Sequence, residues 1–111
     1  MDTSKISILG CGNIGSAIAM GLKKSGEFSS NKIHLTRRKN KTLKKLETHG
    51  FKISNDNKKA VEESSLIILS VGPNHLMDLL KDISPKLNKK QIIISVVSGI
   101  QIKDIQKAIE I

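Results

Sequence analysis

The stretch that decides the fold is Ile8–Ala17, I-L-G-C-G-N-I-G-S-A, in which three glycines form the pattern G-x-G-x-x-G. A short β-rich run, residues 5–9, comes before the glycines, and an amphipathic helical pattern follows them. In this setting Gly10 permits a tight turn, Gly12 lets the backbone approach a pyrophosphate, and Gly15 lets the helix pack closely on the strand. The pattern therefore predicts a phosphate-binding loop at a helix N-terminus rather than an ordinary glycine-rich turn.

Beyond this loop, β-rich runs alternate with helical stripes along the whole chain. Residues 66–71 and 91–97 are largely apolar and β-rich, which is typical of parallel strands covered on both faces. Strands that alternate with helices form a parallel sheet with right-handed crossovers. We therefore expect a doubly wound, Rossmann-like α/β fold of about five β-α units with strand order 3-2-1-4-5. The predicted strands are residues 5–9, 32–36, 51–54, 66–71 and 91–97, and helices are expected near Ile14, Asn40, Asn57, Asn74 (ended by Pro85) and Ile102.

The end of the second predicted strand indicates which dinucleotide the loop would hold. NAD-binding folds place a carboxylate there, about 20 residues after the glycines, to bind the ribose 2′-hydroxyl. Here Thr36 is followed by Arg37, Arg38 and Lys39, and no acid is present. Because a guanidinium pairs with a phosphate through two hydrogen bonds, these residues favour NADP(H) over NAD(H). The alternative is that this basic run, which further lysines continue, is only a solvated helix start.

Length and composition limit the other possibilities. A chain of 111 residues has room for one core, so we expect residues 1–111 to be one dinucleotide-binding domain. Its helical pattern continues to Ile111, which suggests the N-terminal part of a longer protein. The net charge of +9 lies mostly in the first half, where a bound anion explains it better than nucleic acid does. Two Phe and no Trp or Tyr argue against base stacking, and every apolar run is far shorter than the roughly 20 residues of a membrane span.

Few other residues suggest chemistry. The single cysteine, Cys11, cannot form an internal disulfide, so a reducing, cytoplasmic location is expected. A helix N-terminus can lower a thiol pKa, but we expect Cys11 to be a small packing residue. Asn57 is interpreted as a helix N-cap that could also face the adenine ribose, and His75 as a solvated residue. No Ser-His-Asp set, carboxylate pair or metal cluster is visible, so no catalytic residue or metal site is assigned.

Four loops in the same order resemble the pyrroline-5-carboxylate reductase family over essentially the whole chain. They are the glycine loop, Asp56-Asn57, S-V-G-P at residues 70–73 and S-V-V-S-G-I at residues 95–100. Members of this family use NAD(P)H to reduce the C=N bond of 1-pyrroline-5-carboxylate, which makes proline. Together with the pattern above, the resemblance implies these cofactor-binding residues: Gly10, Cys11, Gly12, Asn13, Ile14, Gly15, Thr36, Arg37, Arg38, Asn57, Ser70, Val71, Gly72 and Pro73.

Two departures from the family pattern bear on the substrate. The usual V-K-P is Val71-Gly72-Pro73 here, which removes a cation beside the cofactor, and the usual A-A-G is Val97-Ser98-Gly99, which enlarges residues near the expected nicotinamide. The family carries its imine-binding and proton-donating groups on a C-terminal helical domain that also builds a dimer, so the resemblance implies a small-molecule substrate and a homo-oligomer. The alternatives are a β-hydroxyacid dehydrogenase, an F420-dependent NADP oxidoreductase and a non-enzymatic dinucleotide-binding regulatory relative.

Overall fold

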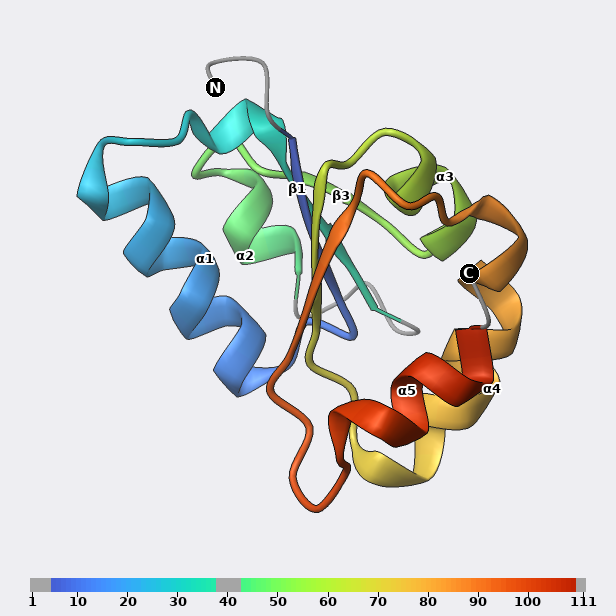
Figure 1. Cartoon of the computed structure of the whole chain (residues 1–111). Helices are drawn as coiled ribbons and strands as arrows, with labels where there is room; N and C mark the ends of the chain where they lie inside the picture. The colour runs from blue at the N-terminus through green and yellow to red at the C-terminus, as the bar shows by residue number, and fades with distance from the viewer. Residues whose placement is uncertain (1–4, 38–42, 110–111) are drawn as a thin grey trace.

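The computed structural model describes residues 5–37 and 43–109. At its centre is a parallel sheet of five strands in the order β3-β2-β1-β4-β5, which confirms the predicted topology (Figure 1). Because the strands are parallel, their carboxyl ends lie at the same edge of the sheet, and the glycine loop leaves the central strand there. The strands are β1 (Ile6–Leu9), β2 (Ile33–Thr36), β3 (Lys52–Ser54), β4 (Leu66–Leu69) and β5 (Ile92–Ser95).

Helices cover the two faces of the sheet unequally. Two helices lie on one face, and three lie on the other (Figure 1). The first face carries α1 (Asn13–Ser25) and α2 (Lys44–Glu47), and the second carries α3 (Asn57–Glu62), α4 (Pro73–Ile83) and α5 (Ile102–Ile109). Two short 3-10 turns, η1 (Ser30–Lys32) and η3 (Ser84–Lys86), complete the connections. This division is expected for the strand order, because the chain crosses to the other face between β3 and β4.

The sheet has a hydrophobic core on each face. Ile6 and Ile8 of β1 pack with α1 and α2, whereas Leu9 packs with α3, α4 and α5. These three side chains are at most 1% exposed, and burying each one contributes about 1.5–3 kcal/mol to the hydrophobic stabilisation. The central strand is therefore held from both sides, which fixes the position of the loop that follows it.

The edge strand β5 differs from the prediction that it is covered on both faces. Ile93 packs against the core under α4 and α5, but its neighbours Ile92 and Ile94 are 60% and 45% exposed. Successive strand residues point to opposite faces, so these two isoleucines point to the α1 side of the sheet. No helix of the described segments lies over that side of β5, and the prediction of two covered faces is wrong for this strand.

One predicted helix boundary changes, and the predicted end of another helix before Pro85 is confirmed. The helix expected from Asn40 is only the four-residue α2 within the described segments, and Asn40 itself lies outside them. α4 ends at Ile83, and Pro85 lies within the 3-10 turn that follows, so the chain stops being α-helical before the proline. Pro85 has no N–H to continue the α-helical hydrogen bonds, so the α-helix ends before it.

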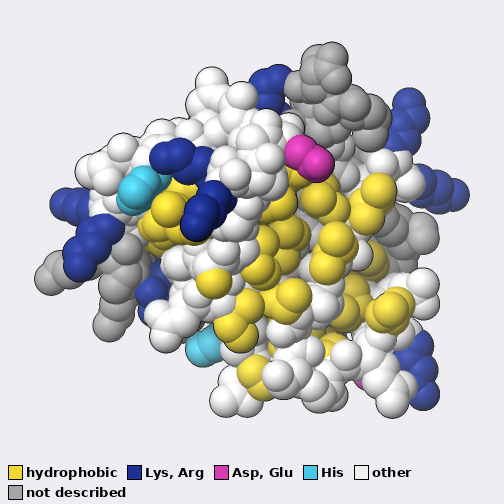
Figure 2. Space-filling model, turned by 90° about the vertical axis from the view of Figure 1, so that its left-hand side faces the viewer, with side chains coloured by type: hydrophobic (Ala, Val, Ile, Leu, Met, Phe, Trp, Pro, Cys, Tyr) yellow, Lys and Arg dark blue, Asp and Glu magenta, His cyan; other side chains and the backbone are white. Residues whose placement is uncertain are grey.

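Viewed from the α1 side, the molecule exposes a broad field of hydrophobic side chains (Figure 2). Ile92, Ile94 and Val96, in and just after β5, are the exposed large apolar residues nearest the uncovered part of the sheet. A patch of this kind on a soluble domain usually marks an interaction surface. Within the segments that the structure describes, every helix is too short or too polar to cross a membrane.

Candidate functional site

The glycine loop forms the strand-to-helix turn that the sequence predicts. Gly10 has a φ of +75°, in the left-handed region that favours glycine, and a Cβ at this position would clash with Val71 Cγ1. A Cβ on Gly15 would lie 2.8 Å from Ser70 Oγ and 3.1 Å from Ile8 Cγ2. Glycine at these two positions therefore lets the turn close and lets α1 approach β1 and β4, as predicted.

Gly12 has the opposite environment. A Cβ at Gly12 would meet no atom within 4 Å, so the space beside this residue is open. Gly12 is also the N-cap of the 13-residue α1, whose first turn holds no acidic residue and whose last turn holds Lys23 and Lys24. The partial positive charge at this helix end favours an anion, and the open space lets the anion approach the backbone. The loop therefore fits the pyrophosphate of a dinucleotide.

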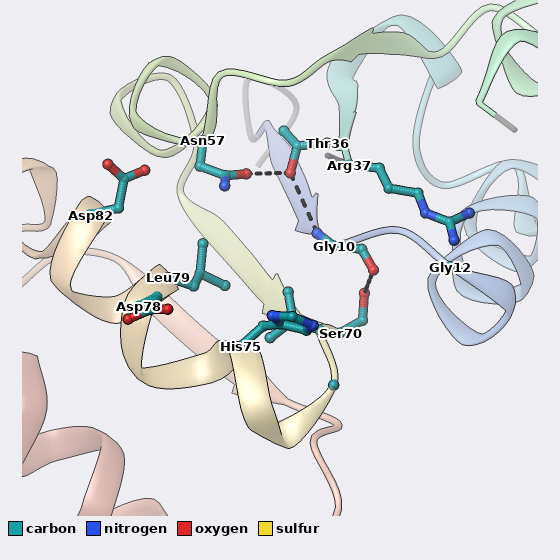
Figure 3. A pocket seen from close by; sticks show the side chains of 12 residues that line it. Gly10, Gly12, Thr36, Arg37, Asn57, Ser70, His75, Asp78, Leu79 and Asp82 are labelled. Carbon is teal, nitrogen blue, oxygen red and sulfur yellow. Dashed lines mark hydrogen bonds between the residues drawn. The ribbon is translucent and has the colours of Figure 1, made fainter. Parts of the chain in front are cut away.

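Thr36 at the end of β2 connects the glycine loop to α3. Its carbonyl accepts a hydrogen bond from Cys11 N at 2.7 Å, and its hydroxyl accepts one from Gly10 N at 3.4 Å. The hydroxyl also donates to Asn57 Oδ1 (Figure 3). Because Thr36 is only 1% exposed, these contacts are protected from water and hold the carboxyl end of β2, the loop and the start of α3 together.

The predicted N-cap role of Asn57 is wrong. The N-cap of α3 is Asp56, whose Oδ1 accepts a hydrogen bond from Lys59 N at 3.1 Å, and Asn57 is the first helical residue. Adjacent Asp and Asn are both good N-caps, so the sequence alone does not choose between them. With the cap supplied by Asp56, the Asn57 side chain is directed at Thr36 and lines the cavity described next.

A cavity of about 570 Å³ lies at the carboxyl edge of the sheet (Figure 3). This volume is within the range of sites that bind small molecules and cofactors. Its walls come from segments that are far apart in the sequence: the glycine loop, the ends of β2 and β4, and the helices α3 and α4. The predicted cofactor-binding residues that line it are Gly10, Gly12, Thr36, Arg37, Asn57, Ser70, Val71 and Gly72.

The remaining predicted residues lie elsewhere. Asn13, Ile14 and Pro73 are exposed at the first turns of α1 and α4, Gly15 is buried under α1, and Arg38 lies outside the described residues. Cys11 is fully buried with its Sγ 3.6 Å from Ser16 Oγ. Burial raises the pKa of the Cys11 thiol, which opposes a thiolate role at the helix N-terminus and agrees with the expected packing role.

Ser70 in the cavity wall stabilises the glycine loop through its hydroxyl. Its hydroxyl donates to the carbonyl oxygens of Leu9 and Gly10, at 3.0 and 3.2 Å. This ties the end of β4 to the glycine loop across the top of the sheet. Since the hydroxyl proton is used in these contacts, Ser70 shapes the loop, and its side chain is left to act toward a ligand only as an acceptor.

Sequence reasoning missed part of the cavity wall. His75, Asp78, Leu79 and Asp82 of α4 line it, and none of them was assigned to the cofactor site. Their spacing of i, i+3, i+4 and i+7 places them along one side of the helix, where Leu79 is buried and the other three are exposed. The available signal was that α4 begins at the carboxyl end of β4, where ligands of doubly wound sheets bind.

The departure at Val97 and Ser98 does not alter this cavity. Val97 is 8% exposed and belongs to the core under α4 and α5, while Ser98 is exposed in the loop after β5. Neither residue is part of the cavity wall. The predicted effect of Val97 and Ser98 near the nicotinamide stays a prediction, because this cavity does not include them.

Comparisons with known proteins agree with this geometry. A family model described as "NADP oxidoreductase coenzyme F420-dependent" matches residues 5–99. Pyrroline-5-carboxylate reductases 1 and 2 of Dictyostelium discoideum are 43% and 40% identical to the chain, over 95% and 98% of its length. The solved pyrroline-5-carboxylate reductase of Coxiella burnetii superposes with a TM-score of 0.91 at 27% identity, over 96% of this chain and 40% of that one.

The matched region is only part of these relatives. The chain spans 19% and 37% of the lengths of the two Dictyostelium proteins. The likeness to pyrroline-5-carboxylate reductases that the loops predicted is nevertheless confirmed by these relatives, and so is the Rossmann-like fold. Because the family model covers residues 5–99 of 111, the chain belongs to the family of coenzyme F420-dependent NADP oxidoreductases.

Proposed function

We propose that this chain binds NADP(H) in the cavity at the carboxyl edge of its sheet. The observation that carries this proposal is that the open side of Gly12 and the side chain of Arg37 border the same cavity. A pyrophosphate beside Gly12 and a 2′-phosphate beside Arg37 both place negative charge next to positive groups. No acidic residue follows Thr36 to repel that second phosphate.

The chain's own residues have distinct tasks in this proposal. Gly12 and the first-turn N–H groups of α1, including those of Asn13 and Ile14, receive the pyrophosphate. The Asn57 side chain uses Oδ1 to accept from Thr36, which leaves its amide nitrogen to donate to a ribose hydroxyl. Val71 supplies an apolar wall above Gly10. Arg38 follows Arg37 directly and is proposed to share the 2′-phosphate.

For the whole protein we propose reduction of the C=N bond of 1-pyrroline-5-carboxylate. The bound nicotinamide would supply the hydride, and residues beyond the cofactor domain would hold the imine. The support is the identity of 43% and 40% to reductases of that name, together with the matching loops. We further propose a homo-oligomer and a reducing, cytoplasmic location, which suits the buried and unpaired Cys11 thiol.

A second candidate is hydride exchange between NADP(H) and coenzyme F420. The description of the matching family model favours it, since it names that coenzyme. Both candidates use the same dinucleotide site, so cofactor binding does not separate them. Oxidation of NADPH with 1-pyrroline-5-carboxylate or with F420 as the acceptor, measured on the full-length protein, distinguishes the two.

Titration calorimetry with NADP and NAD tests the cofactor proposal. A charge-assisted hydrogen bond contributes about 1.5–3 kcal/mol, so the wild type is expected to bind NADP roughly tenfold or more tightly than NAD. The double variant Arg37→Ala/Arg38→Ala should lose this preference while still binding both cofactors through the glycine loop. Equal affinities for the two cofactors in the wild type would contradict the proposal.

A charge-matched control isolates the local effect. Lys23→Ala/Lys24→Ala removes two positive charges from the last turn of α1, away from the cavity. This variant is expected to keep the preference of the wild type, apart from a small loss of general attraction that salt screens. An equal loss of preference in the lysine variant would assign the effect to net charge rather than to Arg37 and Arg38.

A further inference from the structure

The end of the cavity away from the glycine loop is acidic. Asp78 and Asp82 of α4 carry their carboxylates there, with the Leu79 side chain between them and Asn57 on the facing wall (Figure 3). Leu79 is 7% exposed, whereas both aspartates are exposed. The cavity therefore has a phosphate-binding end at Gly12 and an apolar section followed by two carboxylates at the other end.

The two carboxylates repel anions, although the chain as a whole has a net charge of +9. Asp82 forms an ion pair with Lys58 at 3.5 Å, in which both side chains are about half exposed, at 46% and 51%. No described residue forms an ion pair with Asp78. Two carboxylates beside a bound polyanion weaken its attraction unless they accept hydrogen bonds from a neutral part of it. The neutral donors of a dinucleotide are its hydroxyls, the 6-amino group of adenine and the carboxamide NH₂ of nicotinamide.

The position of these carboxylates selects one of those groups. Arg37 and Asn57 lie on the β2 and α3 side of the cavity, and the proposed cofactor role places the adenosine half there. Asp82 lies on the wall that faces Asn57 (Figure 3). The adenine ring is flat and apolar on its faces and carries a 6-amino donor at its edge. Leu79 suits the face of the ring, and the carboxylates suit its amino edge.

We propose that Asp78 and Asp82 recognise the adenine base of the cofactor by accepting a hydrogen bond from its 6-amino group. This inference rests on the proposed binding of NADP(H) and adds a base specificity to it. A hypoxanthine base presents a carbonyl oxygen at the same place, and the two carboxylates repel that oxygen instead of binding it. The cavity thus selects the base as well as the phosphates.

The probe is nicotinamide hypoxanthine dinucleotide phosphate, in which a carbonyl oxygen replaces the 6-amino group of NADP and the adjacent ring nitrogen N1 carries a proton. Titration calorimetry on the full 111-residue chain should show roughly tenfold weaker binding of the hypoxanthine analogue than of NADP, the loss expected for one charge-assisted hydrogen bond. The measured quantity is the ratio of the two dissociation constants. This ratio cancels any general gain in affinity that follows from removing negative charge, because both ligands share that gain.

The variant Asp78→Asn/Asp82→Asn turns two acceptors into amides that can also donate. In this variant, the dissociation constant of the hypoxanthine analogue divided by that of NADP should fall to about one or below, because an amide N–H can bind the hypoxanthine oxygen. The control Glu62→Gln/Asp104→Asn removes the same charge from exposed positions on α3 and α5 outside the cavity, and it should keep the ratio of the wild type.

The outcomes separate this inference from the cofactor proposal. Tight NADP binding with a ratio of about one in the wild type overturns base recognition and leaves the cofactor proposal intact. A wild-type ratio that persists in the Asp78→Asn/Asp82→Asn variant assigns the discrimination to other residues and overturns the role of these two. Failure of the wild type to bind NADP overturns both.

Discussion

Gly12 and Gly15 lie one helical turn apart, yet a side chain has different consequences at each. Gly12→Val places its side chain in open space, so the melting temperature should stay close to that of the wild type while NADP binding is lost. Gly15→Val forces its side chain against Ser70 and Ile8, and such overpacking costs about 1–3 kcal/mol. Thermal unfolding and calorimetric titration of the two variants measure both effects.

The same pair of variants shows what would contradict this interpretation. A domain of this size loses roughly 4–8 °C of melting temperature for each kcal/mol, so the Gly15→Val effect is large enough to observe. If Gly12→Val binds NADP as the wild type does, the phosphates bind elsewhere. If it unfolds as easily as Gly15→Val, the space beside Gly12 is filled in solution.

His34 in β2 makes stability depend on pH. It is 5% exposed, its Nε2 lies 2.7 Å from Ser54 Oγ, and its Nδ1 has no hydrogen-bond partner among the described residues. Burial, followed by the charge of Lys52, lowers the pKa of His34 below its ordinary value of 6.5. The unfolded chain then binds a proton more readily than the folded one, so the stability present above pH 6.5 is lost as the pH falls below it.

Urea unfolding at pH 8, 7, 6 and 5 measures this dependence. The slope contributed by one histidine is at most about 1.4 kcal/mol per pH unit. His34→Gln should reduce the slope between pH 7 and pH 5, whereas His49→Gln, at an exposed position, should keep it. A slope that is the same in the wild type and in His34→Gln would assign the acid sensitivity to other groups.

The residue scale also shows where sequence reasoning succeeds and where it fails. The tasks of Gly10, Gly12 and Gly15 could be predicted because each follows from the local path of one turn. The choice between Asp56 and Asn57 as the cap of α3 could not, since both side chains can cap a helix. It depends on Thr36, which is distant in the sequence and offers Asn57 a different partner.

At the scale of elements, β4 and β5 are almost alike in sequence but differ in burial. Both are short runs rich in isoleucine, with leucine in β4 only, and such apolar runs predict a parallel strand. The run itself does not reveal how far the covering helices extend across the sheet. β4 is covered by helices on both faces, whereas β5 is at the edge and its α1 side is open.

This difference predicts unequal costs for the same substitution. Ile67→Ala in β4 removes a fully buried side chain and should cost about 2–5 kcal/mol of the free energy of unfolding. Ile92→Ala in β5 removes a side chain that is 60% exposed and should change that free energy by about 0.5 kcal/mol or less. Urea unfolding measures both values, and equal losses would mean that the α1 side of β5 is covered in solution.

Helix α4 shows the other reason why a site escapes prediction. The helical spacing of its apolar residues Leu76, Leu79, Leu80 and Ile83 predicts a buried stripe, and they are buried. The same periodicity says nothing about a cavity on the flank of that stripe, because a cavity requires α3 and the glycine loop to face the helix. Asp78 and Asp82 therefore appear in the sequence as ordinary solvated charges, and only the fold places them in the wall of a cavity.

At the scale of the whole molecule, the chain has an open cavity and an exposed apolar face. It spans 37% of the length of pyrroline-5-carboxylate reductase 2 of Dictyostelium discoideum, to which it is 40% identical. Figure 2 shows the hydrophobic field on the α1 side, and the cavity wall of α4 includes the exposed His75 and Asp78. The described residues form a five-stranded sheet with helices on both faces, and the cavity at its carboxyl edge is open to solvent. A cofactor held here remains accessible to water.

This arrangement predicts that the 111 residues alone bind NADPH without reducing 1-pyrroline-5-carboxylate at a useful rate. Hydride transfer requires the imine carbon to be held about 3–3.5 Å from the donor carbon in aligned geometry, and most of the rate gain comes from that positioning. The described residues supply one wall of such a site. Water that reaches the nicotinamide also weakens the electrostatic stabilisation of the transition state.

Loss of NADPH absorbance with the imine as substrate tests this prediction. The comparison is a chimera in which these residues replace the corresponding segment of pyrroline-5-carboxylate reductase 2 of Dictyostelium discoideum, which is 40% identical over that segment. The chimera should reduce the imine, and its Gly12→Val variant should not, because the cofactor cannot bind. Turnover by the 111 residues alone at the rate of the chimera would mean that they carry the proton donor and the imine site themselves, and Ser95, Ser98 and His75 at the carboxyl edge of the sheet would then be the groups to test.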